Sequence, residues 1–107
     1  LFYILSTFCE SLIVESIAWS LGAPTVTPFG LELAQQHIGG LEVVSDEETK
    51  VALKKLLEDG KLLVEPAASC TLAALHRKQS FLPEDAHAVL VMCSGNVSLE
   101  QVQQWLL

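Results

Sequence analysis

The chain has 107 residues, and its 13 acidic against 6 basic side chains give a formal net charge of −7. This length supports one domain, so we treat residues 1–107 as a single unit that can bury a core without disulfides or a metal. The acidic balance argues against a nucleic-acid partner and against binding to an anionic membrane, because no stripe of lysine and arginine is available to contact phosphates.

The first part of the chain begins with residues 1–9, which are predicted to form a buried strand or the start of a helix. Helices are predicted at 10–21 and 27–38, and short strands at 23–26 and 41–44. The apolar run at 1–9 is too short to span a bilayer. Gly22 is a usual residue after the end of a helix. Thr27 with Pro28 predicts a helix start, because proline at the first helical position loses no hydrogen bond.

In the rest of the chain, helices are predicted at 46–58, 66–76 and 99–105, and strands at 61–65 and 88–92. Ser45 and Glu48 have the spacing of a capping box, in which the hydroxyl accepts from the Glu48 amide and the carboxylate reaches back. The helix that begins at Pro66 consists largely of small residues, which allow a close approach to a sheet or ligand. Ser98 and Gln101 have capping-box spacing at the last helix.

Strands that alternate with helices predict the α/β class. We expect a partial three-layer sandwich with a mostly parallel sheet covered on both faces. In such folds ligands bind beyond the carboxyl ends of the strands. Glu65 with Pro66, and the segment 93–96, occupy positions of that kind.

Motifs of autonomous catalysis are absent from the sequence: there is no Gly-rich phosphate loop, no Gly-x-Ser-x-Gly and no His-Glu-x-x-His. The acidic run 46–48 is interpreted as a helix cap, and no metal site is predicted. The cysteines, Cys9, Cys70 and Cys93, lack Cys-x-x-Cys spacing, which argues against a disulfide framework or a zinc site and favours a reducing cytoplasm.

Two residues at strand-to-helix junctions remain as candidates. Glu65 is either an exposed acid at a strand end or a carboxylate that is paired or used, because a buried carboxylate is otherwise costly. Cys93 is either a buried structural cysteine or a thiol that faces the crevice, since five apolar residues precede it and a Ser-Gly-Asn turn follows. Cys70 is expected to be a structural cysteine.

At these residues the sequence resembles the C-terminal part of the serine/threonine dehydratases, which are pyridoxal-phosphate enzymes of the tryptophan synthase β-like fold. The resemblance rests on VEPA followed by small residues, on CSGN at 93–96, and on SIAWSLGAPT at 16–25. It implies that pyridoxal phosphate is the cofactor and that serine or threonine loses its α-proton and β-hydroxyl, which yields a 2-oxo acid and ammonia. Serine racemase and related enzymes share the pattern.

The resemblance also implies three cofactor-binding residues. Cys93 matches a cysteine or serine that hydrogen-bonds the pyridine nitrogen, and a thiol, being a weak acid, does not hold that nitrogen protonated as a carboxylate would. Less charge is then drawn into the ring, which favours elimination over transamination. Glu65 matches a glutamate near the cofactor. Ser20 matches a small residue that lines the ring.

The family's Schiff-base lysine, its substrate loop and its phosphate loop have no match in this sequence, and none of the lysines matches the family's anchor. We therefore expect no catalytic residue in this chain. Leu1 in place of methionine, and an apparent helix that continues to Leu107, suggest a fragment, with a trimmed but complete domain as the alternative.

Three hypotheses for function follow. The first is a cytoplasmic fragment of a serine/threonine ammonia-lyase that acts on a small amino acid. The second is a stand-alone, non-catalytic binding or oligomerisation domain derived from the same fold. A third, a hydrolase built on Cys93, lacks a histidine in a context that makes it the base. Hydrophobic residues make up 50% of the chain and charged residues 18%, so we expect a homo-oligomer or association with the missing part of the enzyme.

Overall fold

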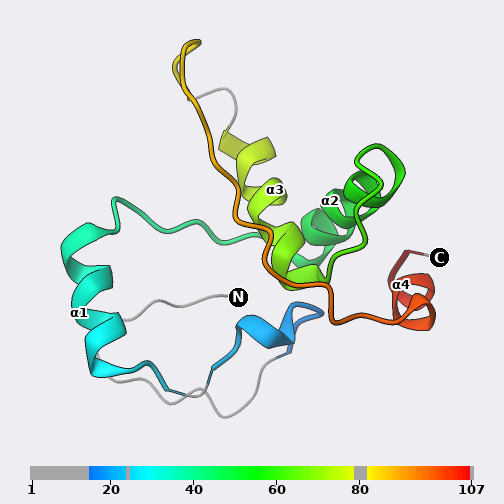
Figure 1. The fold of residues 1–107 in the computed structure, drawn as a ribbon, viewed down its shortest axis with the longest axis horizontal. Coiled ribbons are helices and arrows are strands. Elements are labelled where there is room, and N and C mark those ends of the chain that lie inside the picture. Colours follow the sequence, from blue (N-terminus) through cyan, green and yellow to red (C-terminus); the bar gives the residue numbers. More distant parts are fainter. Residues whose placement is uncertain (1–14, 24, 79–81, 107) are drawn as a thin grey trace.

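A computed structural model describes residues 15–23, 25–78 and 82–106. Within them, the regular structure consists of a short 3₁₀ helix and four α-helices (Figure 1). In chain order these are η1 (Trp19–Leu21), α1 (Pro28–His37), α2 (Asp46–Glu58), α3 (Pro66–Lys78) and α4 (Leu99–Leu106). None of the helices in these ranges is both long and apolar enough to cross a membrane.

The helix starts lie where the capping residues predict them. The Thr27 hydroxyl accepts from the Gly30 amide at 3.1 Å, and Pro28 occupies the first turn of α1. Ser45 and Glu48 form the complete capping box of α2, because the Glu48 carboxylate also accepts from the Ser45 amide at 2.7 Å. These predictions are confirmed, since a cap depends only on residues within one turn.

The core lies between α2 and α3, which pack side by side (Figure 1). Its buried apolar residues form two clusters. The first comprises Leu53, Leu56, Val64 and Ala68, and the second comprises Val44, Ala52 and Ala73. The small residues of α3 allow this close packing. Ser69 is fully buried, and its hydroxyl lies 2.8 Å from the Pro66 carbonyl and 3.2 Å from the Thr49 carbonyl, so it satisfies its donor between the two helices.

The predicted α/β class, with its three-layer sandwich and parallel sheet, is wrong for the described residues, which form helices and no strand. Residues 61–65 and 88–92 form no regular secondary structure, and the nearest backbone bond joins the Glu65 amide to the carbonyl of Ser94, beyond the second run, at 3.1 Å. A strand needs a ladder of such bonds with a neighbour, and one bond does not make a ladder. The short strands predicted at 23–26 and 41–44 are absent where the chain is described.

The helix predicted at 10–21 is also wrong over its described part, where only the single turn η1 forms. The segment 1–9, predicted as a strand or helix start, lies outside the described residues. A helical spacing of apolar residues therefore did not suffice to specify a helix here, where Ser16 and Ile17 bond to Asp46 of α2.

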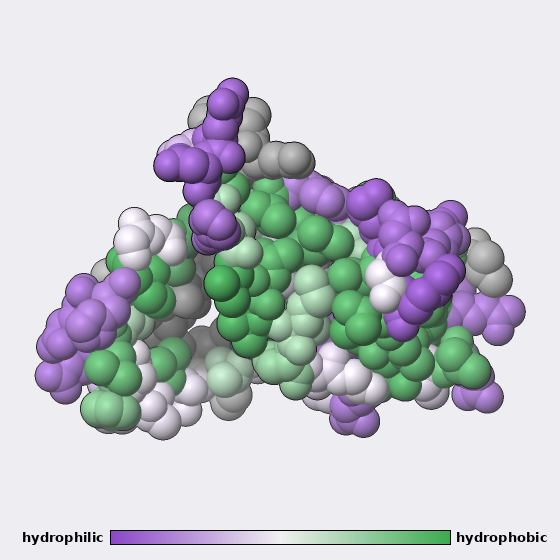
Figure 2. All heavy atoms as spheres, turned by 45° about the horizontal axis from the view of Figure 1, so that its top comes forward, coloured by the Kyte–Doolittle hydropathy of each residue, from purple (hydrophilic) through white to green (hydrophobic). Residues whose placement is uncertain are grey.

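Apolar side chains remain on the surface of the described residues, as Figure 2 shows over the middle of the molecule. Val89 is 87% exposed and Val91 is 66% exposed, on the segment that follows α3. Helix α1 packs against none of the other described helices and stands apart from them in Figure 1. Its Phe29 is 70% exposed.

Candidate functional site

Glu65 and Ser20, two of the predicted site residues, meet at the start of α3. Glu65 is the residue before α3, and only 9% of its surface is exposed. The Ser20 hydroxyl, on η1, donates to Glu65 Oε1 at 2.6 Å. The structure thus excludes an exposed strand-end acid, and it gives the carboxylate the partner that its burial requires.

The segment that contains Cys93 and Ser94 also lies against the start of α3. The Glu65 amide donates to the Ser94 carbonyl at 3.1 Å, which brings the residue next to Cys93 against the start of α3. The side chain of Cys93 is exposed and forms no disulfide. This contradicts the interpretation of Cys93 as a buried structural cysteine and leaves its thiol accessible to solvent.

Cys70, in contrast, is a structural residue of α3. Its thiol is half-buried, contacts the Thr49 hydroxyl at 3.5 Å and donates to the Pro66 carbonyl at 3.4 Å. Burial raises the pKa of the Cys70 thiol, so it stays protonated and unreactive near neutral pH. Cys70 was expected to be a buried structural cysteine; its contacts agree with a structural role, but the residue is half-buried.

The segment that carries Ser20 is held by the first residue of α2. Asp46 accepts the Ser16 hydroxyl at 2.7 Å through Oδ1 and the Ile17 amide at 3.1 Å through Oδ2. Ala18, which follows, is buried. The negative charge at the positive end of the α2 dipole stabilises this arrangement, which fixes where η1 begins.

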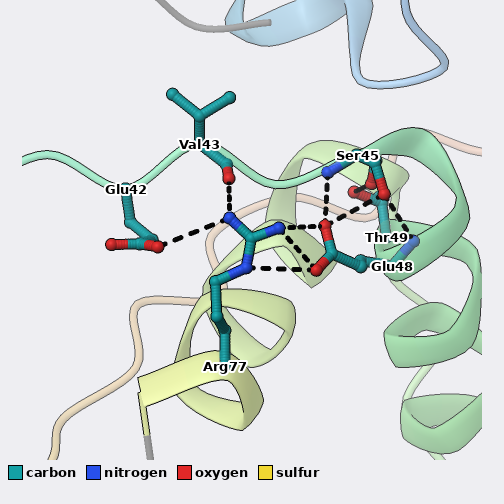
Figure 3. Close-up of polar contacts among 6 residues, drawn as sticks. All are labelled: Glu42, Val43, Ser45, Glu48, Thr49 and Arg77. Carbon is teal, nitrogen blue, oxygen red and sulfur yellow. Dashed lines mark hydrogen bonds and ion pairs between the residues drawn. The ribbon is translucent and has the colours of Figure 1, made fainter.

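A second polar cluster joins the first turn of α2 to the C-terminal end of α3 (Figure 3). The Arg77 guanidinium donates to both carboxylate oxygens of Glu48, at 2.6 and 2.7 Å from Nη2, and it also bonds to Glu42 and to the Val43 carbonyl. The Ser45 amide and then the Arg77 guanidinium lower the pKa of Glu48 to about 2. Sequence analysis missed this cluster, although Arg77 is the only arginine in the chain.

The lysines whose side chains the structure describes are paired elsewhere. Their ammonium groups pair with carboxylates or a carbonyl of α2 and its C-terminal turn, as Lys50 with Glu47, Lys54 with Glu58, Lys55 with Asp59 and Lys61 with the Glu58 carbonyl. None of these lysines bonds to Ser20, Glu65 or Cys93. Among the residues that the structure describes, no group of histidine, cysteine and acidic side chains is placed to hold a metal ion.

Comparison with known proteins shows the family to which this sequence is similar. Residues 5–94 match the family model described as "Pyridoxal-phosphate dependent enzyme". The chain belongs to this family. The resemblance seen in the sequence is thereby confirmed, together with the cofactor on which the family depends.

Individual proteins of known name are also similar to this chain. An L-serine dehydratase/L-threonine deaminase of Mus musculus is 37% identical over 99 residues, which cover 84% of this chain and 30% of that protein. A serine dehydratase-like protein of the same species is 37% identical over 103 residues, covering 85% of this chain and 30% of the relative. A phenylserine dehydratase of Ralstonia pickettii is 39% identical over 62 residues, covering 58% and 19%. The chain therefore spans about 30% of the length of the first two relatives.

The residues at the start of α3 fit the ring end of pyridoxal phosphate. An exposed thiol and a buried carboxylate, whose Oε2 has no donor among the described residues, are hydrogen-bonding groups suited to a pyridine ring and its substituents. The described ranges contain no Gly-rich loop for the phosphate. The predicted roles of Cys93, Glu65 and Ser20 as cofactor ligands stay predictions.

Proposed function

We propose that this chain supplies the ring-side part of the cofactor site in a pyridoxal-phosphate-dependent serine/threonine dehydratase, an ammonia-lyase that converts a hydroxy-amino acid into a 2-oxo acid and ammonia. The observation that carries the proposal is the meeting of Ser20, Glu65 and the Cys93–Ser94 segment at the start of α3 in a chain of this family. The names of the dehydratase relatives support the choice of reaction.

Each residue has a distinct task in this proposal. When bound, pyridoxal phosphate withdraws electrons from the α-carbon of the amino acid, which makes the α-proton acidic. Cys93 would offer a weakly acidic thiol to the pyridine nitrogen and would not keep that nitrogen charged. Glu65 would accept a hydrogen bond at the edge of the ring, and Ser20 would line the ring's face.

The remaining chemistry comes from outside this sequence. A lysine for the Schiff base and a loop for the phosphate belong to a further segment of enzyme, with which this chain associates in the cytoplasm during amino-acid metabolism. The exposed apolar side chains support such an association, because a patch of this kind is covered when it meets its partner. The chain alone is expected to show no turnover.

A chimera tests the proposal. In it, this chain replaces the matching segment of the mouse L-serine dehydratase/L-threonine deaminase, so that the relative supplies the rest of the enzyme. We expect bound cofactor in the absorbance spectrum and pyruvate from L-serine. Cys93→Ser should retain turnover within a few fold, whereas Cys93→Ala should lower it about tenfold, the effect of losing one hydrogen bond at the ring.

Cys70→Ala is the matched control, because it removes the other described cysteine, which is half-buried in α3, and should leave turnover unchanged. Circular dichroism establishes that each chimera is folded. A folded chimera that binds no cofactor and forms no 2-oxo acid would rule out the proposed function.

Oligomerisation is the second candidate role, and the exposure of Val89 and Val91 favours it. We expect the isolated chain to self-associate, because these side chains lie on an extended segment that has no charged residue between Ala88 and Cys93. Light scattering should show a mass above the monomer's 11.6 kDa. The double variant Val89→Glu, Val91→Glu should restore the monomer. A monomeric unmodified chain that binds no hydrophobic dye would exclude this role.

A further inference from the structure

The predicted role of Glu65 near the cofactor does not explain what holds its carboxylate in one orientation. Its side chain is more than nine-tenths buried, yet it stands at the edge of a site that must receive a ligand. A buried carboxylate is costly unless a donor compensates for its lost hydration. Among the described side chains, the single donor to it is the Ser20 hydroxyl, at 2.6 Å.

The donor is anchored independently of the acceptor. The turn of η1 is closed by the Leu21 amide bonding to the Ala18 carbonyl at 3.0 Å, and Ala18 itself is buried. The residues before it are held by Asp46 of α2, through the Ser16 hydroxyl and the Ile17 amide. Ser20 therefore presents its hydroxyl from a backbone that does not depend on Glu65.

The acceptor is equally well anchored. The Glu65 amide bonds to Ser94, and its carbonyl accepts the Ala68 amide at 3.0 Å in the first turn of α3. With both backbones fixed, the bond between the two side chains selects one orientation of the carboxylate. Oε1 is then occupied, whereas Oε2 has no donor within the described ranges.

We infer that Ser20 is a positioning residue: its hydroxyl fixes the Glu65 carboxylate so that Oε2 is directed to a hydrogen-bond donor of the bound pyridoxal phosphate. The ligand in this inference rests on the proposed function. The role differs from lining the ring, for which any small side chain suffices, because it requires a hydroxyl. Threonine should replace Ser20, and alanine should not.

The first measurement uses the 107-residue chain without cofactor. Side-chain carbon couplings of Glu65, measured by nuclear magnetic resonance on ¹³C-labelled protein, report whether the carboxylate arm holds one rotamer. Ser20→Ala should produce rotamer averaging, and Ser20→Thr should keep a single rotamer, since Ser20 is exposed and the added methyl group needs no buried space. Ser98→Ala, which removes the serine hydroxyl that caps α4, should leave the Glu65 couplings unchanged.

The second measurement uses the chimera and titrates it with pyridoxal phosphate. Ser20→Ala should raise the dissociation constant about tenfold and shift the absorbance maximum of the bound cofactor, because one charge-assisted bond no longer orders Glu65. Ser20→Thr should restore both values. A role confined to folding would not shift the absorbance of the bound cofactor in a variant that is as stable as the parent.

The outcomes separate the two proposals. Unchanged Glu65 couplings in Ser20→Ala overturn the inference, and so does a chimera that carries Ser20→Ala and binds cofactor with unchanged affinity and spectrum. A folded chimera that binds no cofactor contradicts the proposed function instead. In that case the couplings alone decide whether Ser20 positions Glu65.

Discussion

Replacing Leu53 by alanine is expected to lower the free energy of unfolding by about 2 to 5 kcal/mol. Leu53 lies on α2 with only 1% of its surface exposed, in contact with the cluster that includes Val64 and Ala68. Truncation removes the apolar transfer energy and leaves a cavity, because the close packing of α2 on α3 cannot collapse to fill it. Urea unfolding followed by circular dichroism measures the change.

Leu99→Ala is the matched control for this prediction. Leu99 carries the same side chain at the start of α4, but it is 74% exposed. Its truncation is expected to change the unfolding free energy by less than about 0.5 kcal/mol. Equal effects of the two substitutions would mean that α2 and α3 do not form the core.

Acid should remove stability that Glu48 provides. Its carboxylate accepts from the Ser45 amide and binds Arg77, and its pKa falls from 4.5 to about 2. The folded chain therefore binds the proton less readily than the unfolded chain does. The contribution is complete above pH 4.5 and is lost as the pH falls towards 2, the folded pKa. Because the side chain is 38% exposed, solvent and salt screen part of the effect.

Urea midpoints measured between about pH 6 and pH 2 test this prediction. Glu48→Gln keeps the shape and loses the charge, so its midpoint should change less with pH than that of the parent. Glu47→Gln is the control, because it removes a neighbouring, 81% exposed carboxylate that does not bind Arg77 and so tests the loss of a negative charge in the same turn. A Glu48→Gln variant whose midpoint falls as steeply as the parent's would contradict the assignment.

The parts of the fold that could be predicted from sequence are those that neighbouring residues determine. The start of α2 follows from Ser45 and Glu48, and the start of α3 from Pro66, because caps act within one turn. The sheet could not be inferred reliably, since an apolar run such as 88–92 becomes a strand only if a partner lies beside it. The described residues give this run no such partner.

In the candidate site, too, local sequence patterns could be predicted and long-range contacts could not. Glu65 and Cys93 could be identified because each follows an apolar run and matches a family motif. The bond between Ser20 and Glu65 joins residues that lie 45 positions apart, and Arg77 reaches Glu48 over 29 positions. Neither pair has a local pattern in the sequence, so only the packing of the helices reveals them.

The first turn of α2 links the stability of the molecule to the order of its site. Asp46 in this turn holds the segment that leads to Ser20, and Glu48 in the same turn holds Arg77 of α3. We expect a local opening of this one turn to break both attachments together, so that these elements open as one cooperative unit. The carboxylate of Glu65 would then lose its orientation through a fluctuation that begins at residues which do not touch it.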